Sequence, residues 1–242
     1  SGHIEQIRGA LKAGMKGIDI GANIGYFALI ESQLVGPEGK IFCIEPAPDN
    51  FSLLKKNIAE NNFGVRTECF QYLIGDKNGT GKLFLSEAAN SHSVSAVSNR
   101  SVEVPMLTLD RFMASENIEP SEIDFLRMDI EGYEVMAMQY MNSLFIGRKK
   151  PLKLFIELHP SAYEEWSWTL EKFINYLISR GFILRSVVER EIDEQGLIKD
   201  RAVSMVNGMK LSEMLRRMMM IKKENEAGIL ENLFLELPTD AA

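Results

Sequence analysis

Short apolar segments typical of β-strands alternate along this chain with longer segments that show the apolar spacing of amphipathic helices. In the helix predicted at 50–62, Phe51, Leu54 and Ile58 recur at three- and four-residue intervals and share one face. Such alternation predicts parallel strands joined by crossover helices, a doubly wound α/β fold. The predicted strands are 17–20, 40–45, 67–74, 123–130, 153–159, 182–190, 201–206 and 232–237, and the other predicted helices are 131–146 and 164–180.

Two regions interrupt this alternation. Residues 75–103 are rich in Gly, Ser, Asn and Ala, and they predict a hairpin-like loop insertion, at about 76–103, ahead of the fourth strand. Residues 209–226 predict a Met-rich helix whose apolar stripe belongs to the core or to a dimer surface. Since the chain shows neither an internal repeat nor a linker, we expect a single domain over 1–242 that could form a homodimer.

Composition excludes several classes of protein. The formal net charge of the 242 residues is −7, which argues against nucleic acid as a partner because such binding relies on basic surfaces. No apolar run approaches the ~18 residues of a membrane helix, so we expect no membrane span. Cys43 and Cys69 lie in strand-like segments, and the first residues lack a secretory signal pattern. We therefore expect buried thiols in a reducing, cytoplasmic compartment.

The stretch "DIGANIG" connects the first predicted strand to a helix. Gly21 allows a sharp turn out of the strand, and Gly25 allows the helix to begin close to the sheet and to a ligand. A dinucleotide fold would carry G-x-G-x-x-G and bind pyrophosphate at the helix start. The middle glycine is missing here, and Asp19 stands where it would repel a pyrophosphate. The pattern favours a ligand with a positive charge, such as the ammonium of an amino acid.

The second predicted strand ends in Glu45, and Pro46 stops it. A carboxylate at this strand end can accept hydrogen bonds from both hydroxyls of a ribose. One acid for an ammonium, one for a ribose and a glycine-rich turn between them indicate S-adenosylmethionine. A nicotinamide dinucleotide stays open as an alternative.

Six motifs resemble the FkbM family of methyltransferases in order and spacing: "IDIGANIGYF", "IEPAPDNFSLLKKNI", "LIGDKNGTGKLFL", "VPMLTLDRF", "LRMDIEGYE" and "FIELH". The resemblance covers roughly residues 16–160. It implies a class I methyltransferase (Rossmann-like) fold, a seven-stranded, mostly parallel sheet with a reversed last strand and helices on both faces. It also implies S-adenosylmethionine as methyl donor and a hydroxyl on a sugar, glycan or secondary metabolite as acceptor.

The resemblance also implies site residues. Those expected at the methionine end of the cofactor and its loop are Asp19, Gly21, Asn23, Gly25, Tyr26 and Phe27. Glu45, with Pro46 beside it, would hold the ribose, Asp76 would contact adenine, and Ser93 in "NSHS" would lie near the cofactor. Arg127 stands where a Lys is expected, and Tyr133 where a small residue is common.

Methyl transfer to a hydroxyl needs positioning of the acceptor and a base near it. Asp129, at the end of the fourth predicted strand, would lie beside the cofactor sulfur. Glu131 would share a helix face with Glu134 three residues on. We predict His159 as the base, oriented by Glu157 two residues earlier on its strand, with Asp129 and Glu131 shaping the acceptor site.

Two alternatives at this site stay open. His92 in the insertion could serve as the base if its loop closes over the site. Asp129, Glu131, Glu157 and His159 could also converge on Mg²⁺ or Ca²⁺, although no compact metal-ligand spacing is present and we expect no metal.

The sequence thus predicts an S-adenosylmethionine-dependent methyltransferase that acts on a hydroxyl of a small molecule or glycan. Transfer to nitrogen, on RNA or a small amine, is a second hypothesis. A cofactor-binding module that does not catalyse is a third.

Overall fold

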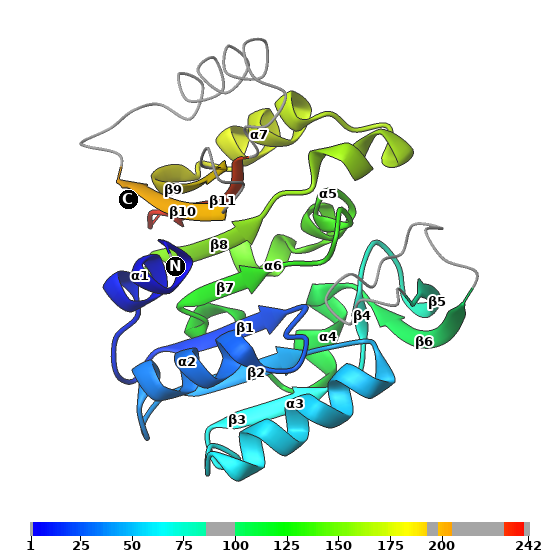
Figure 1. Cartoon of the computed structure of the whole chain (residues 1–242), viewed down its shortest axis with the longest axis vertical. Helices are drawn as coiled ribbons and strands as arrows, with labels where there is room; N and C mark the ends of the chain where they lie inside the picture. Colours follow the sequence, from blue (N-terminus) through cyan, green and yellow to red (C-terminus); the bar gives the residue numbers. More distant parts are fainter. Residues whose placement is uncertain (1, 86–99, 193–197, 205–229, 240–242) are drawn as a thin grey trace.

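The computed structural model describes residues 2–85, 100–192, 198–204 and 230–239. The strands of its large sheet are β1 (Lys16–Ile20), β2 (Lys40–Ile44), β3 (Thr67–Phe70), β7 (Phe125–Met128), β8 (Leu152–Glu157), β9 (Ile183–Ile192), β10 (Ile198–Ser204) and β11 (Leu230–Leu237). They lie in the order β10-β9-β11-β8-β7-β1-β2-β3 (Figure 1).

The strands from β8 across to β3 are all parallel. β11 is inserted between β8 and β9 and is antiparallel to both. This arrangement confirms the predicted class I methyltransferase fold, including the reversed last strand. The sheet has one strand more than the seven expected, because β10 folds back antiparallel against β9 at the edge.

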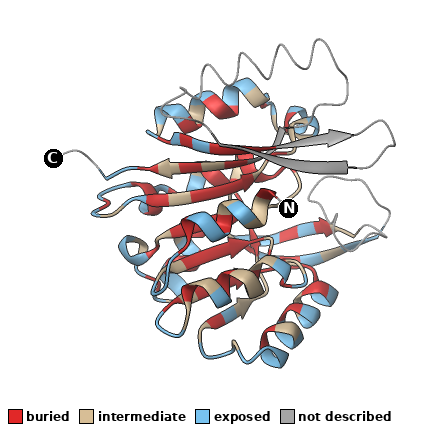
Figure 2. Ribbon diagram, turned by 60° about the vertical axis from the view of Figure 1, so that its left-hand side comes forward, coloured by how far each residue is buried: buried red, intermediate tan, exposed pale blue. Residues whose placement is uncertain are grey.

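Helices cover both faces of the sheet. The helices are α1 (Gly2–Ala10), α2 (Tyr26–Val35), α3 (Pro48–Glu60), α4 (Leu109–Ser115), α5 (Glu134–Ala137), α6 (Asn142–Phe145) and α7 (Leu170–Ser179), with short 3₁₀ helices η1 (Pro120–Glu122), η2 (Met138–Tyr140) and η3 (Pro160–Trp166). The first three share one apolar cluster and the other four a second cluster. All four residues of β7 are buried, as expected of a parallel strand covered on both sides. Figure 2 shows buried residues concentrated in the sheet, while exposed residues lie on the outer sides of the helices.

A second, small sheet lies beside the large one, with the order β4 (Leu73–Ile74), β6 (Ser101–Leu107), β5 (Gly79–Phe84). β5 and β6 form the predicted antiparallel hairpin, while residues 86–99 between them lie outside the described residues. The prediction of one strand at 67–74 was wrong. β3 ends at Phe70 because its partner β2 ends at Ile44, and after Gln71 and Tyr72 the chain pairs with β6 as β4.

The helix predicted at 131–146 was also wrong in extent. Glu131 has φ 55° and Gly132 has φ 98°, and these left-handed conformations cannot belong to a right-handed helix. Regular helix begins only at Glu134, and a 3₁₀ turn then separates α5 from α6. At 164–180 the chain first forms η3, and α7 begins at Leu170 behind the Thr169 cap.

The predicted Met-rich helix at 209–226 lies outside the described residues, so its role in a core or a dimer stays a prediction. Among the residues that the structure describes, no helix combines the length and apolar character that crossing a membrane requires.

Candidate active site

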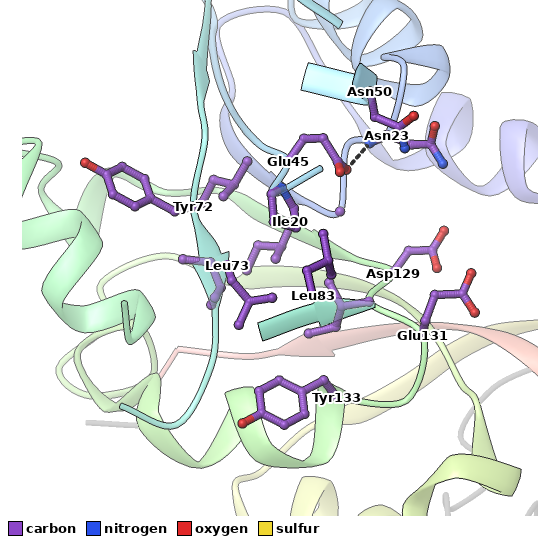
Figure 3. Close-up of a pocket in the computed structure, with 15 residues that line it drawn as sticks. Ile20, Asn23, Glu45, Asn50, Tyr72, Leu73, Leu83, Asp129, Glu131 and Tyr133 are labelled. Atoms are coloured by element: carbon purple, nitrogen blue, oxygen red, sulfur yellow. Dashed lines mark hydrogen bonds between the residues drawn. The ribbon is translucent and has the colours of Figure 1, made fainter. Parts of the chain in front are cut away.

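A pocket opens where β1, β2 and β7 end, and residues of the small sheet form one wall of it (Figure 3). The polar side chains that line it are Asn23, Asn50, Glu45, Asp129 and Glu131. The larger apolar and aromatic side chains are Ile20, Ile44, Tyr72, Leu73, Ile74, Leu83, Ile130 and Tyr133.

The glycine loop forms one rim of this pocket. Gly21 has φ 79°, and a Cβ on it would lie 1.9 Å from the carbonyl oxygen of Asp129, so only glycine fits. Gly25, with φ 94°, immediately precedes α2. A Cβ there would lie 2.8 Å from Leu54 Cδ1, so its close neighbour is α3 rather than the sheet. The loop therefore brings backbone against the ends of β1 and β7.

Glu45 lies in the pocket with both carboxylate oxygens held. The N–H of Asn23 donates to Oε2 and the N–H of Ala47 donates to Oε1, each at 2.8 Å (Figure 3). Burial raises the pKa of Glu45 to about 7, against the opposing effect of these two backbone hydrogen bonds. Each oxygen keeps a second lone pair. The carboxylate can therefore accept two hydroxyl hydrogen bonds without losing its own support.

Asp19 does not line the pocket. Its side chain is fully buried, and Arg127 Nη1 donates to its Oδ1 at 2.9 Å. Burial raises the pKa of Asp19, while Arg127 opposes that shift. Arg127 Nη2 also donates to Asp129 Oδ2 at 3.0 Å, and the guanidinium lies 4.0 Å from the centre of the Phe27 ring. Arg127 thus joins the acid inside β1 to the acid at the pocket.

Four ionisable side chains meet beyond the ends of β7 and β8. His159 Nδ1 lies 2.9 Å from Glu134 Oε1, while its Nε2 lies 3.6 Å from Glu131 Oε2 and 4.0 Å from Asp129 Oδ1. Glu134 is fully buried, and the other three are part-buried. The predicted catalytic residues His159, Asp129 and Glu131 are therefore neighbours in space.

The protonation of His159 does not suit the predicted base. Burial by itself lowers the pKa of His159, but the hydrogen bond to Glu134 and the surrounding carboxylates outweigh it and raise this pKa to about 10. The ring is then a cation at neutral pH and has no lone pair to accept a proton. Burial, together with its acidic neighbours, raises the pKa of Glu131, although His159 opposes this shift. Glu131 is therefore better suited than His159 to accept a proton.

The expected partner of His159 was also wrong. Glu157 ends β8 and lines a separate, smaller cavity with Phe27 and Arg127. The carboxylate that holds the His159 ring is Glu134. His159 follows the strand rather than extending it, so the two-residue alternation of a strand does not reach it.

The remaining predicted residues lie around this pocket or outside the described chain. Pro46 lines the pocket. Tyr26 is exposed at the start of α2, and Phe27 packs beside Arg127. Asp76 accepts a hydrogen bond from Tyr133 Oη at 2.8 Å. Ser93 and His92 lie outside the described residues.

Sequence reasoning missed the wall that faces the polar groups. Leu73 comes from β4, Leu83 from β5 and Tyr133 from the turn before α5, and all three line the pocket. Tyr133 also packs edge-on against Trp166, with ring centres 4.9 Å apart. The one available signal was that Tyr133 stands where a small residue is common in similar motifs.

Fold and site together define a class I methyltransferase, with a glycine loop after β1 and an acid after β2. Residues 19–184 match the methyltransferase FkbM domain. This match spans more than half of the chain, and the chain belongs to the FkbM family of S-adenosylmethionine-dependent methyltransferases.

Known structures and a curated relative agree with this class. An O-methyltransferase from Bacillus cereus, solved in complex with SAH, superposes with TM-score 0.52 at 9% identity over 98% of this chain and 79% of its own. A proposed rRNA-methylase from Clostridium thermocellum also gives 0.52, at 9% identity over 99% and 94%. A protein-L-isoaspartate O-methyltransferase from Methanothrix thermoacetophila is 28% identical over 89 residues, 37% of this chain and 39% of that protein.

The cofactor of this family is S-adenosylmethionine, and the residues present fit it. The pocket combines a carboxylate held for hydroxyl recognition, at Glu45, with a wall of apolar and aromatic side chains. Asp129, Glu131 and His159 offer ligand atoms within 4.8 Å of one another, a spacing that could accommodate a metal ion. Among the described residues, no further group of this kind occurs.

Proposed function

We propose that this methyltransferase acts on a hydroxyl oxygen of a small molecule or glycan. Bound S-adenosylmethionine supplies a methyl group on a sulfonium, which leaves as a neutral thioether. The protein must position the acceptor oxygen in line with that methyl and receive its proton. The observation that carries the proposal is that Asp129 and Glu131 line the pocket that also contains Glu45, with His159 beside both of them.

The proposed roles follow from charge and burial. Glu45 holds the ribose hydroxyls, and the backbone of the glycine loop lies against the cofactor. The Glu131 carboxylate accepts the proton of the acceptor hydroxyl as the new C–O bond forms and the C–S bond breaks. The His159 cation stabilises the negative charge that develops on that oxygen. Asp129, tied to Arg127, shapes the same side of the pocket.

Transfer to the nitrogen of a small amine is the second candidate. It is supported by the excess of carboxylates around His159, which would attract a cationic acceptor. The formal net charge of −7 weighs against RNA as that acceptor. A module that binds the cofactor without transfer is a third candidate, and the presence of Glu45, Asp129 and Glu131 weighs against it.

The first test is calorimetric titration with S-adenosylmethionine, with NAD as the control ligand. Transfer of labelled methyl to a panel of sugars, hydroxylated metabolites and small amines follows. Product in the hydroxyl panel that is lost in Glu131→Gln supports the proposal. Methylated amines alone would transfer the proposal to nitrogen chemistry, and cofactor binding without any product would favour the binding module.

A further inference from the structure

Glu134 is a fully buried carboxylate that no step of the proposed reaction uses. It is the first residue of α5, and it follows Asp129 and Glu131 closely along the chain. A buried carboxylate is retained at little cost only when donors surround it, because its desolvation is otherwise expensive. The Oε2 of Glu134 has no hydrogen-bond partner among the described residues, so the donors at Oε1 must offset its desolvation.

One carboxylate oxygen of Glu134 accepts hydrogen bonds from three donors. Its Oε1 accepts the N–H of Gly132 at 3.1 Å and the N–H of Ile130 at 3.3 Å, and lies 2.9 Å from His159 Nδ1. An oxygen that already accepts two backbone N–H groups is an acceptor toward the third, so the donor is His159 Nδ1. The carboxylate therefore joins the turn after β7 to a side chain that follows β8.

The turn at residues 130–132, to which Glu134 binds, has an unfavourable backbone conformation. Glu131 and Gly132 are consecutive left-handed residues, with φ 55° and 98°. This conformation is unfavourable for Glu131, and it directs neighbouring N–H groups toward a common anion. A Cβ on Gly132 would lie 2.3 Å from Ala162 Cβ, so the turn also packs tightly against η3, which follows His159.

We propose that Glu134 is a positioning residue, which sets the turn carrying Asp129 and Glu131 and the ring of His159 relative to one another. Because Glu134 occupies Nδ1, the ring presents Nε2 toward the two carboxylates. The distances of 3.6 and 4.0 Å from Nε2 exceed hydrogen-bond length, which leaves Nε2 available to a group placed between them. The inference rests on the proposed function in one respect, which is that the group placed between Nε2 and the two carboxylates is the methyl acceptor.

Three variants separate positioning from charge. Glu134→Gln keeps an amide oxygen that can accept all three donors. Glu134→Asp is one methylene shorter and cannot reach both the turn and the ring, and Glu134→Ala removes every contact. We expect a kcat about 100-fold lower for the Asp and Ala variants, in line with an acceptor site misplaced by about 1 Å, and a much smaller loss for Gln. The dissociation constant for S-adenosylmethionine should change less than about threefold.

A structural readout needs no acceptor. The chain has only three histidines, His3, His92 and His159, so ¹⁵N-histidine labelling gives few ring signals, and His159→Ala identifies that of His159. We expect a protonated, hydrogen-bonded Nδ1 in the wild type and in Glu134→Gln. In Glu134→Asp this signal should move to that of a ring without the bond.

A control distinguishes positioning from loss of stability. Val135 is buried next to Glu134 on α5, so Val135→Ala should lower the melting temperature without moving the His159 signal or kcat. If Glu134→Ala fails to fold, the Asp and Gln variants carry the test. Wild-type turnover and ring signal in Glu134→Asp would overturn the inference. So would a Gln variant as impaired as Asp, since charge would then matter and not position. A wild-type protein that binds no S-adenosylmethionine would instead overturn the proposed function.

Discussion

Gly21 and Asp129 meet where β1 and β7 end, and the backbone oxygen of Asp129 occupies the space that a side chain at position 21 would need. A Cβ there would come within 1.9 Å of it. The contact lets the glycine loop and the turn that carries the acceptor-side acids share one corner of the pocket (Figure 3). The glycine loop and the turn that carries Asp129 and Glu131 are therefore in direct contact.

Gly21→Ala should damage both parts of the site. We expect a loss of at least ~2 kcal/mol in the free energy of unfolding, because strain at positive φ adds to the clash with Asp129. Affinity for S-adenosylmethionine should fall with it. Gly14→Ala is the matched control, since Gly14 also has positive φ (82°) but nothing lies within 4 Å of its Cβ. Chemical denaturation and calorimetry measure both, and equal losses in the two variants would refute the role of the clash.

Affinity for S-adenosylmethionine should depend on pH through Glu45. In the proposed site the ionised carboxylate binds the ribose hydroxyls, and burial raises the pKa of Glu45 to about 7. Affinity should thus be roughly tenfold weaker at pH 6 than above pH 8. Glu45→Gln should bind weakly at every pH, whereas Glu38→Gln, at an exposed position, should behave as wild type. An unchanged dissociation constant from pH 8 to 6 would contradict the assignment.

The same shift makes the ligand-free protein pH-sensitive. Because the pKa of Glu45 is raised from 4.5 to about 7 on folding, the folded state binds its proton more tightly than the unfolded state. The stability gained from this proton is fully present below the unfolded pKa and is lost as the pH rises through 7. Urea denaturation at pH 5 and pH 8 should show this loss in the free energy of unfolding of the wild type. The part of the loss that comes from Glu45 should be absent in Glu45→Gln.

His159→Ala should separate turnover from cofactor binding. The dissociation constant for S-adenosylmethionine should stay within about threefold of wild type, whereas kcat should fall ~100-fold with the loss of the cation. Since the pKa of His159 is raised to about 10, wild-type turnover should decline as the pH rises through 10, and so should the stability that its charge contributes. Turnover at saturating S-adenosylmethionine that does not decline as the pH rises through 10 would contradict the role of the His159 cation.

The buried pair of Asp19 and Arg127 should matter for stability. Arg127→Met leaves Asp19 as an uncompensated buried charge, and we expect a loss of about 3–5 kcal/mol. Asp19→Asn with Arg127→Met removes both charges and should recover part of that loss. Urea denaturation of the single and double variants measures the coupling. Strictly additive losses would show that the ion pair contributes nothing.

Removal of metal ions should leave the proposed activity unchanged. The His159 cation already offsets part of the negative charge where Asp129 and Glu131 converge. Incubation with EDTA followed by gel filtration should not alter turnover. Loss of activity on chelation, restored by Mg²⁺ or Ca²⁺, would instead show that a metal ion binds these residues.

Much of the fold could be predicted from the sequence because the spacing of apolar residues shows which side of each helix or strand is buried. α3 and the strands β1, β2, β7 and β8 were predicted close to their observed limits. α4, with seven residues, is too short to display a helical period. The break after Phe70 depends on where β2 ends, which is a property of the partner strand and not of the segment itself.

Which side chains line the pocket was predictable where their positions follow from strand ends, and was not where they follow from backbone conformation. Glu45, Asp129 and Gly21 were identified because parallel strands bring their carboxyl ends to one edge. The role of Glu134 depends on the left-handed turn at Glu131 and Gly132, which residue spacing does not reveal. The protonation of His159, which follows β8, depends on three carboxylates that follow β7, a convergence that only the folded chain creates.

The small sheet of β4, β6 and β5 gives the pocket two walls of separate origin. The polar side chains Glu45, Asp129 and Glu131 follow strands of the large sheet, whereas Leu73 comes from β4 and Leu83 from the β5–β6 hairpin. Substitutions in the small sheet could therefore change the shape of the pocket while Glu45, Asp129 and Glu131 keep their positions. For protein engineering, Leu73 and Leu83 are accordingly the side chains to change when a different pocket shape is wanted.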